Sequence, residues 1–338
     1  MNSVKILDVT LRDGGYRNNF NFTKDYACKA ISRLADIGVQ YCEIGYCNGS
    51  FVRKPEHGLT SSVSVDYLRA VSTSSGQNLS LAVMVHPKNV GLSDFEMLHE
   101  EGVSMIRVCL KREQLNEGLA TIKLAKSLGF LVSANVTHIT AQTVSAVINT
   151  SLQAEGAGAD LVCFADSNGN MIPTDVERLI GRVSNRVIVP LGFHAHNNLS
   201  LALANAIAAM EAGAEYIDTS ICGMGKGAGN LHLAMLIAYL DRSGIKHQYD
   251  LVKAIELSLL TSKQVPDSDI SAPLLDIMMG AYNFSYDIGK RLQETLSTFQ
   301  LASEFHALQV MHQQDQVARL APRAVGSAAP MPHVRHSM

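Results

Sequence analysis

A repeated glycine signal constrains what this chain can fold into more than any other feature. An amphipathic segment ends at a glycine and a short apolar segment follows at once, at Gly38, Gly102, Gly129, Gly158 and Gly213. Glycine just past a helix adopts the left-handed backbone conformation without strain, so each one predicts a helix end. Successive glycines of the signal lie 64, 27, 29 and 55 residues apart. One strand plus one helix takes about 27–32 residues, so these spacings predict a parallel sheet covered by helices.

Eight apolar segments are expected to be the strands of that sheet. They are Ile6–Leu11, Tyr41–Cys47, Leu79–His86, Met105–Leu110, Leu131–Val136, Leu161–Ala165, Ile188–His194 and Tyr216–Ser220. Eight strands alternating with helices are typical of a (β/α)8 TIM barrel. A doubly wound sheet, the alternative, usually has fewer strands and spaced glycines after the first strand, which Leu11–Gly15 lacks. The sequence therefore predicts an α/β protein with a TIM-barrel catalytic domain over residues 1–245.

The repeat stops after the barrel. Residues 246–315 are helix-like and rich in Leu, Ile and Met, which predicts a C-terminal helical extension packed on the barrel or on a second subunit. Residues 316–338 carry three arginines, three prolines and no acidic residue, which predicts a disordered tail.

The composition excludes several classes of protein. With 47% hydrophobic and 17% charged residues, the chain is neither disordered nor a coiled coil. Its net charge is −3 and it has no basic block, so neither nucleic acid nor an anionic membrane is an expected partner. No signal peptide and no apolar stretch of the ~18 residues that span a bilayer is found. Six cysteines without a CxxC pair are expected to be buried thiols, and a cytoplasmic protein is predicted.

Polar residues gather at the carboxyl ends of the predicted strands, where the catalytic groups of such barrels lie. Those ends carry Arg12, Asp13, Glu43, His86, Arg107, Lys111, Asn135, His138, Asp166–Asn168, His194–Asn197 and Gly223–Asn230. A strand that only builds a core needs no such ending, so one rim of the barrel is predicted to be the active site.

His194 and His196 are the sharpest metal signal. Residues i and i+2 of a strand point to one face, so both imidazoles can converge on one ion, and Asp13 can complete a set of two histidines and a carboxylate. The alternative is a pair of hydrogen-bonded histidines at a strand end. Arg12, beside Asp13, can hold the carboxylate of a 2-oxo acid or neutralise an enolate oxygen, unless it forms only a rim salt bridge. Gly223–Asn230 is expected to be a tight loop that closes the site.

Leu11–Gly14, His194–Asn197 and Gly223–Asn230 together resemble the divalent-metal barrels of the 3-hydroxy-3-methylglutaryl-CoA lyase and 2-isopropylmalate synthase superfamily. Within it, the chain looks most like the 4-hydroxy-2-oxovalerate aldolases. The resemblance implies a divalent ion, Mn²⁺ or Mg²⁺. The implied site residues are Asp13, His194 and His196 as metal ligands, Asn230 near the metal, and Arg12 against a pyruvate enolate.

The resemblance also implies reaction and partners. Such enzymes cleave 4-hydroxy-2-oxo acids to pyruvate and an aldehyde, and run in reverse. A homodimer through the helical extension is implied. For the nearest members a complex with an acylating aldehyde dehydrogenase is implied too, which no residue of this chain indicates.

The chain departs from the family pattern at the proton-transfer group. The aldolases place a catalytic histidine shortly after the Arg-Asp-Gly motif, where this chain has Tyr16. A phenol with a pKa of ~10 is a poor base at neutral pH. The candidates are Tyr16 acting through a water, Glu43, and Tyr282 or Tyr286 of the extension.

A Claisen-type acyltransferase or acyl-CoA lyase on the same barrel is the alternative function. Such synthases usually carry a longer regulatory domain after the barrel, and Cys222 precedes the glycine loop instead of lying within it, unlike the cysteine of the acyl-CoA lyases. A non-catalytic binding barrel would need a vestigial metal set, against which the intact Asp13, His194 and His196 argue. The sequence therefore favours a metal-dependent aldolase.

Overall fold

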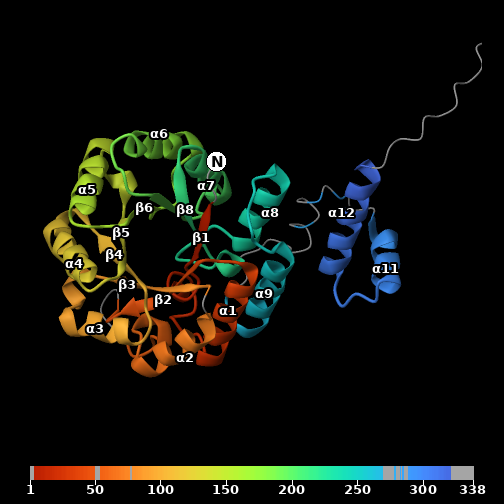
Figure 1. Ribbon diagram of the computed structural model, residues 1–338, viewed down its shortest axis with the longest axis horizontal. Helices are drawn as coiled ribbons and strands as arrows, with labels where there is room; N and C mark the ends of the chain where they lie inside the picture. The colour runs from red at the N-terminus through yellow and green to blue at the C-terminus, as the bar shows by residue number, and fades with distance from the viewer. Residues whose placement is uncertain are drawn as a thin grey trace, which may run out of the picture. The chain divides into compact units, whose positions relative to one another are not determined.

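Eight parallel strands form the centre of the protein. The computed structural model describes residues 4–49, 54–76, 78–268, 278, 282, 284 and 288–320. Each strand pairs with the next along the chain, and β8 pairs with β1 to close a barrel (Figure 1). The strands are β1 (Lys5–Asp8), β2 (Tyr41–Cys47), β3 (Ser80–Val85), β4 (Met105–Leu110), β5 (Leu131–Val136), β6 (Leu161–Asp166), β7 (Leu191–Ala195) and β8 (Ala214–Thr219). The predicted (β/α)8 barrel is confirmed.

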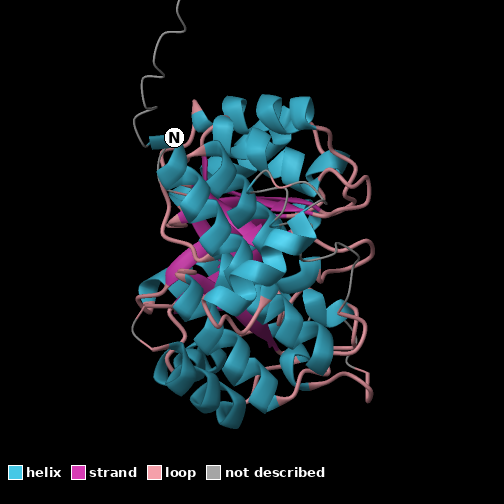
Figure 2. Cartoon of the chain, turned by 90° about the vertical axis from the view of Figure 1, so that its right-hand side faces the viewer, coloured by secondary structure: helices cyan, strands magenta, loops and turns pink. Residues whose placement is uncertain are grey.

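Helices enclose the strands, as Figure 2 shows. Those that alternate with the strands are α1 (Lys24–Ile37), α2 (Val65–Ser75), α3 (Leu92–Glu100), α4 (Leu115–Ser127), α5 (Val144–Gly156), α6 (Pro173–Ser184), α7 (Ala202–Glu211) and α8 (Leu233–Ser243). All five glycines of the repeated signal have a positive φ, between 86° and 108°. Helix α1 shows the mechanism, because Thr23 caps its first turn by accepting from the Tyr26 N–H and left-handed Gly38 ends it.

The beginning of β7 differs from the predicted strand. The sequence pattern placed it at Ile188, whereas β7 begins at Leu191 and Ile188 is 95% exposed. The backbone N–H groups of Ile188 and Val189 donate to the Glu155 carboxylate at 2.6 and 2.9 Å. These two residues therefore belong to the loop before β7, because their N–H groups bind the Glu155 side chain instead of the backbone of a neighbouring strand.

The chain forms two compact units, residues 1–281 and residues 282–338, so the segment after α8 contributes to both. Helix α9 (Leu251–Gln264) belongs to the first unit and packs against α1 and α8. In the second unit, α11 (Gly289–Thr298) packs against α12 (Glu304–Leu320), and Arg291 forms an ion pair with Asp315 at 2.6 Å. The predicted tail begins at residue 316, within α12, and residues 321–338 lie outside the described residues. None of the described helices has the length and apolar character that crossing a membrane requires.

Candidate active site

The turn after β1 brings Arg12 and Asp13 together at the rim. Their N–H groups both donate back to Val9 O, at 3.2 and 2.7 Å, which folds the chain sharply at the end of the strand. Thr10 Oγ1 accepts the N–H of Ile221 at 2.8 Å and ties this turn to the loop after β8. Arg12 is 6% exposed and Asp13 3%, so both charges act where water screens them little.

Asp13, His194 and His196 form a buried group with the spacing of metal ligands. The Nε2 atoms of His194 and His196 lie 3.9 and 4.0 Å from Asp13 Oδ2. Each ring uses its other nitrogen elsewhere, since His194 Nδ1 lies 3.0 Å from Asp218 Oδ2 and His196 Nδ1 lies 3.3 Å from Gly229 O. An Nδ1–H donated to these oxygens leaves both Nε2 lone pairs directed to the same place, which is the usual arrangement of histidine ligands.

Asn230 adds a fourth potential ligand atom, an amide oxygen, to this group. Its Nδ2 donates to Asp13 Oδ2 at 2.9 Å and to Met224 O at 3.1 Å. Its Oδ1 is buried and accepts no hydrogen bond among the described residues. Buried carbonyl oxygens are usually paired, so an unpaired one beside a carboxylate and two imidazoles fits a bound cation.

The protonation states also suit a divalent ion. Burial raises the pKa of Asp13, but Arg12, His196 and His194 outweigh it and hold that pKa well below its ordinary value. Burial lowers the pKa of His196, although Asp13 opposes this. A carboxylate that stays ionised and an imidazole that stays neutral are the forms that bind metal, and this mixture of oxygen and imidazole ligands is typical of first-row divalent ions.

An ionic network lies directly beneath the group. Glu43 Oε2 accepts from Arg12 Nε at 2.6 Å and from Arg107 Nη1 at 3.1 Å, and Arg107 Nη2 donates to Asp218 Oδ2 at 2.6 Å. Arg12 also contacts Asp13 directly. The network holds three carboxylates and two guanidinium groups, all buried, and so carries one excess negative charge that a bound cation would offset.

A cavity of about 290 Å³ opens above Arg12, Asp13, His194 and His196. Its other lining residues are Tyr16, Tyr46, Met84, His86, Cys109, Lys111, Asn135, Thr137, His138, Ala165, Ser167, Asn168 and Lys226. The rim predicted from the strand ends is thus largely the lining of one cavity.

The expected proton-transfer residues occupy different places. Tyr16 lines the cavity, and its hydroxyl lies 3.1 Å from that of Tyr46. Glu43 lies below Arg12 and is not among the residues that line the cavity. Tyr282 belongs to the second unit, where its ring stacks on His312 with centroids 4.3 Å apart, and Tyr286 lies outside the described residues.

Two site residues were not anticipated, Tyr46 and Asp218. In a regular strand Tyr46 would face away from Glu43, but the register of β2 against β3 shifts between Glu43 and Tyr46. Gly45, with a φ of 151°, lies at that shift, and a glycine within a strand pattern was the available signal. Asp218 was recognisable only as an acid inside an apolar strand. His86, named above among the strand-end residues of the predicted rim, lines the cavity and stacks on Tyr46, with centroids 5.7 Å apart.

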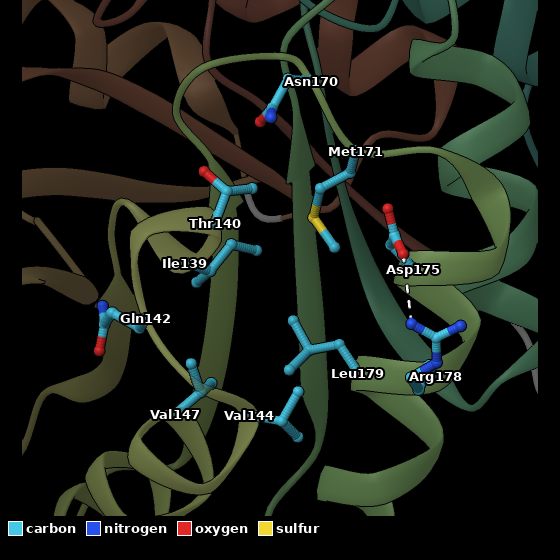
Figure 3. Close-up of a pocket in the computed structure, with 10 residues that line it drawn as sticks. All are labelled: Ile139, Thr140, Gln142, Val144, Val147, Asn170, Met171, Asp175, Arg178 and Leu179. Carbon is cyan, nitrogen blue, oxygen red and sulfur yellow. Dashed lines mark hydrogen bonds and ion pairs between the residues drawn. The ribbon is translucent and has the colours of Figure 1, made fainter.

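A second cavity of about 290 Å³ has different chemistry. Figure 3 shows the side chains of Val144, Met171 and Leu179 converging toward its middle. The charged groups drawn there, Asp175 and Arg178, face each other at 3.5 Å. Because this cavity offers an apolar wall and an already paired charge, the chemistry is assigned to the first cavity.

Comparisons with known proteins place the chain in one family. The sequence profile of the HMGL-like family matches residues 3–260. A 4-hydroxy-2-oxovalerate aldolase of Moorella thermoacetica is 32% identical over 256 residues, which cover 76% of this chain and 75% of that protein. One from Carboxydothermus hydrogenoformans is 34% identical over 255 residues, 75% of this chain and 76% of that protein.

Solved structures share the fold. The N-terminal domain of a candidate aldolase from Bacteroides vulgatus is 29% identical with a TM-score of 0.68, covering 85% of this chain and 99% of that domain. An HMG-CoA lyase of Bacillus subtilis gives a TM-score of 0.70, covering 82% of this chain and 98% of that one. At 19% identity, the second likeness shows the fold alone.

Proposed function

The chain belongs to the HMGL-like family, and from that membership we propose that it is a divalent-metal-dependent aldolase that forms or cleaves 4-hydroxy-2-oxo acids through a pyruvate-type enolate. The observation that carries the proposal is the convergence of Asp13, His194 and His196 beside the Arg12 guanidinium. The two aldolases compared above, which share about a third of their residues with this chain, support the same reaction by their names.

Cleavage requires two charge movements. The C4 hydroxyl of the substrate loses its proton and becomes the aldehyde carbonyl while the C3–C4 bond breaks. The electron pair remains on C3 as the enolate of pyruvate, which takes up one proton at C3 to give pyruvate. A divalent ion, proposed as Mn²⁺ or Mg²⁺, acts when bound as a Lewis acid toward the 2-oxo group. Asp13, His194, His196 and the Asn230 side chain would hold it.

Arg12 stabilises the enolate in this proposal. Its Nε and Nη1 are fixed by Glu43 and Asp13, and its Nη2 donates to none of the described residues although Arg12 lines the cavity. A fixed, desolvated donor directed at a developing oxyanion typically contributes about 2.7–4 kcal/mol to the transition state. Glu43 positions this donor, because its carboxylate lies between the two guanidinium groups and does not line the cavity.

Tyr16 is the proposed proton-transfer group. It lines the cavity, and Tyr46 holds its hydroxyl at 3.1 Å. Burial raises the pKa of Tyr46 well above its ordinary value, although Arg12 opposes this, so Tyr46 stays protonated. Tyr16 can then exchange a proton with substrate through a water, with Tyr46 as a fixed hydrogen-bond partner. A role of Tyr282 stays a prediction.

The acyl-CoA lyase alternative gains no support from Cys222. That thiol is buried and donates to Ser258 O at 3.3 Å, away from the residues that line the cavity. The homodimer, the complex with an acylating aldehyde dehydrogenase and the cytoplasmic location stay predictions.

Exchange of the pyruvate methyl protons tests the proposal. The Mn²⁺-loaded protein is incubated with pyruvate in D₂O, and the methyl signal is followed by NMR. Exchange that needs the metal and is lost in His194→Ala is expected. His247→Ala is the matched control, because His247 pairs with Asp241 at 3.1 Å outside this cavity. Absence of exchange in the loaded wild-type protein, with turnover of an acyl-CoA, would replace the proposal with the Claisen alternative.

A further inference from the structure

Two lysines of the active-site cavity have no carboxylate partner in the described part of the chain. Lys111 follows β4 and is half-buried, and Lys226 lies exposed in the loop after β8. Among the described residues, neither ammonium group forms an ion pair with a carboxylate. Lys226 Nζ lies over the Tyr16 ring, 5.7 Å from its centroid, which places this charge beside the cavity wall. A lysine that is held at a pocket without a partner is available to a ligand.

The other charges of the cavity are already committed. Arg12 pairs with Asp13 and Glu43, and Asp13 is the one carboxylate among the described lining residues. Burial, with a smaller contribution from the charges of Lys111 and Arg12, lowers the pKa of His86 to about 4. His86 is therefore neutral at pH 7, as expected where positive charge is in excess. Counted together with Lys111 and Lys226, the buried network and the cavity walls hold four cations against three carboxylates, and a bound divalent ion would add to that excess.

The wall around Lys111 is polar. In the barrel order, β4 and β5 lie across from the pair β1 and β8, and β6 follows β5. Thr137, His138, Ser167 and Asn168 follow β5 and β6 and line the cavity there. This wall suits a substrate part that carries oxygen atoms better than it suits a short alkyl group. An alkyl group would displace the water that hydrogen-bonds to these side chains and would offer no hydrogen bond in its place.

The donor substrate does not account for both lysines. In the proposed reaction, the 2-oxo group and the enolate charge belong beside Arg12 and the metal ligands. One cation can hold the carboxylate of the 2-oxo acid, and a second remains for the other substrate. An anionic group on the aldehyde would form charge-assisted hydrogen bonds, which are shorter and about twice as strong as neutral ones.

We propose that the acceptor aldehyde carries an anionic group, a carboxylate or a phosphate ester, which Lys111 binds and Lys226 helps to neutralise from the loop after β8. The inference rests on the proposed aldolase function and names the substrate class of the same site. In the synthetic direction, C3 of the pyruvate enolate forms a bond to the aldehyde carbon, and the aldehyde oxygen takes up a proton. The anionic group is not altered.

Pairs of aldehydes that match in length test the inference. Addition of pyruvate to butanal is compared with addition to succinic semialdehyde, and addition to glyceraldehyde with addition to glyceraldehyde 3-phosphate. The readout is the ratio of kcat/KM for the charged and uncharged members of each pair. A ratio of roughly tenfold or more is expected for at least one pair, and the preferred pair distinguishes a carboxylate from a phosphate site.

Three variants locate the source of the preference. In Lys111→Met, alone or with Lys226→Met, the ratio is expected to fall roughly tenfold, toward one. The matched control is Lys88→Met, since Lys88 is an exposed lysine of the nearby β3 loop that does not line the cavity, and it should keep the wild-type ratio. Because each ratio is internal to one preparation, a general loss of activity cancels.

Two outcomes would overturn the inference. One is a ratio near or below one for both pairs in the wild-type protein. The other is a preference for charged acceptors that survives in the Lys111→Met/Lys226→Met double variant. Methyl-proton exchange of pyruvate without any aldehyde is recorded on the same wild-type preparation. Exchange without acceptor preference refutes only this inference, whereas absence of exchange refutes the aldolase function itself.

Discussion

At the scale of single residues, Arg12 is the group on which the proposed chemistry depends most. Its guanidinium uses Nε for Glu43 and Nη1 for Asp13, whereas Nη2 donates to none of the described residues and Arg12 lines the cavity. The ammonium of a lysine is a point charge on a flexible chain and cannot keep two fixed partners while directing a third donor. The proposed role of Arg12 therefore depends on the fixed position of its guanidinium as well as on its charge.

Replacing Arg12 by lysine should separate these two properties. Arg12→Lys is expected to lower kcat about 10²–10³-fold, since the positive charge stays but the fixed donor is lost. Steady-state cleavage of a 4-hydroxy-2-oxo acid measures the effect. The matched control is Arg69→Lys, because Arg69 also holds a carboxylate with two nitrogens, that of Glu101, but on the surface, and it should leave kcat within about twofold. An Arg12→Lys enzyme as active as the control would remove Arg12 from the proposed mechanism.

At the scale of elements, the irregularity in β2 shapes the site. Its register against β3 shifts between Glu43 and Tyr46, so that Glu43 reaches Arg12 and Tyr46 reaches Tyr16 from the same strand. Gly45 permits the shift, because its φ of 151° is one that other residues rarely adopt. A Cβ at this position would lie 2.6 Å from Thr60 O and 2.9 Å from Val63 Cγ1.

Gly45→Ala should therefore cost stability and also disturb the tyrosine pair. The strained backbone and the collision with backbone oxygen are expected to lower the free energy of unfolding by about 1–3 kcal/mol. Urea denaturation measures this, with Gly181→Ala as the matched control. Gly181 lies within α6, where an added Cβ meets no atom within 4 Å, and its replacement should stabilise by about 0.5–1 kcal/mol. Equal stability of the two variants would contradict the role given to Gly45.

These elements also show how far the sequence could predict the structure. Local signals were sufficient for the strand order and the helix ends, because each glycine acts on its own turn of the chain. The i and i+2 spacing of His194 and His196 likewise predicted that they would converge. Tyr46 escaped prediction because a one-residue register shift reverses the face that a side chain takes. The shift is a matter of how β2 pairs with β3, which the pattern of β2 alone does not encode.

At the scale of the whole molecule, the barrel depends on the seam between β1 and β8. Asp8 pairs with Thr219 across this seam, and it is fully buried. Its carboxylate accepts from the N–H and the hydroxyl of Thr10, both at 3.0 Å. Tyr249, just before α9, donates to Val4 O at 2.7 Å and accepts from the Ile6 N–H at 3.1 Å. The segment after α8 therefore helps to close the barrel as well as covering it.

Asp8 makes this seam sensitive to pH. Burial raises the pKa of Asp8 from its ordinary value of 3.8 to about 7, partly opposed by Thr10. Between about pH 4 and pH 7 the folded protein thus binds more protons at Asp8 than the unfolded chain does. The contribution of Asp8 to the free energy of unfolding consequently falls as pH rises through that window, by up to roughly 4 kcal/mol.

Asp8→Asn removes this titration and can keep both contacts to Thr10, with Oδ1 accepting from the Thr10 N–H and Nδ2 donating to Thr10 Oγ1. Relative to wild type, the free energy of unfolding of the variant is expected to rise steadily between about pH 4 and about pH 8, by up to roughly 4 kcal/mol. Urea denaturation at several pH values measures the difference, in which the other titrating groups cancel. Asp66→Asn, at a carboxylate whose side chain is 82% exposed, is the control and should show little trend. If the difference in free energy of unfolding between Asp8→Asn and wild type did not change with pH, Asp8 would be ionised in the folded protein. Its buried charge would then be stabilised by neighbouring groups, and the expected pH dependence would be refuted.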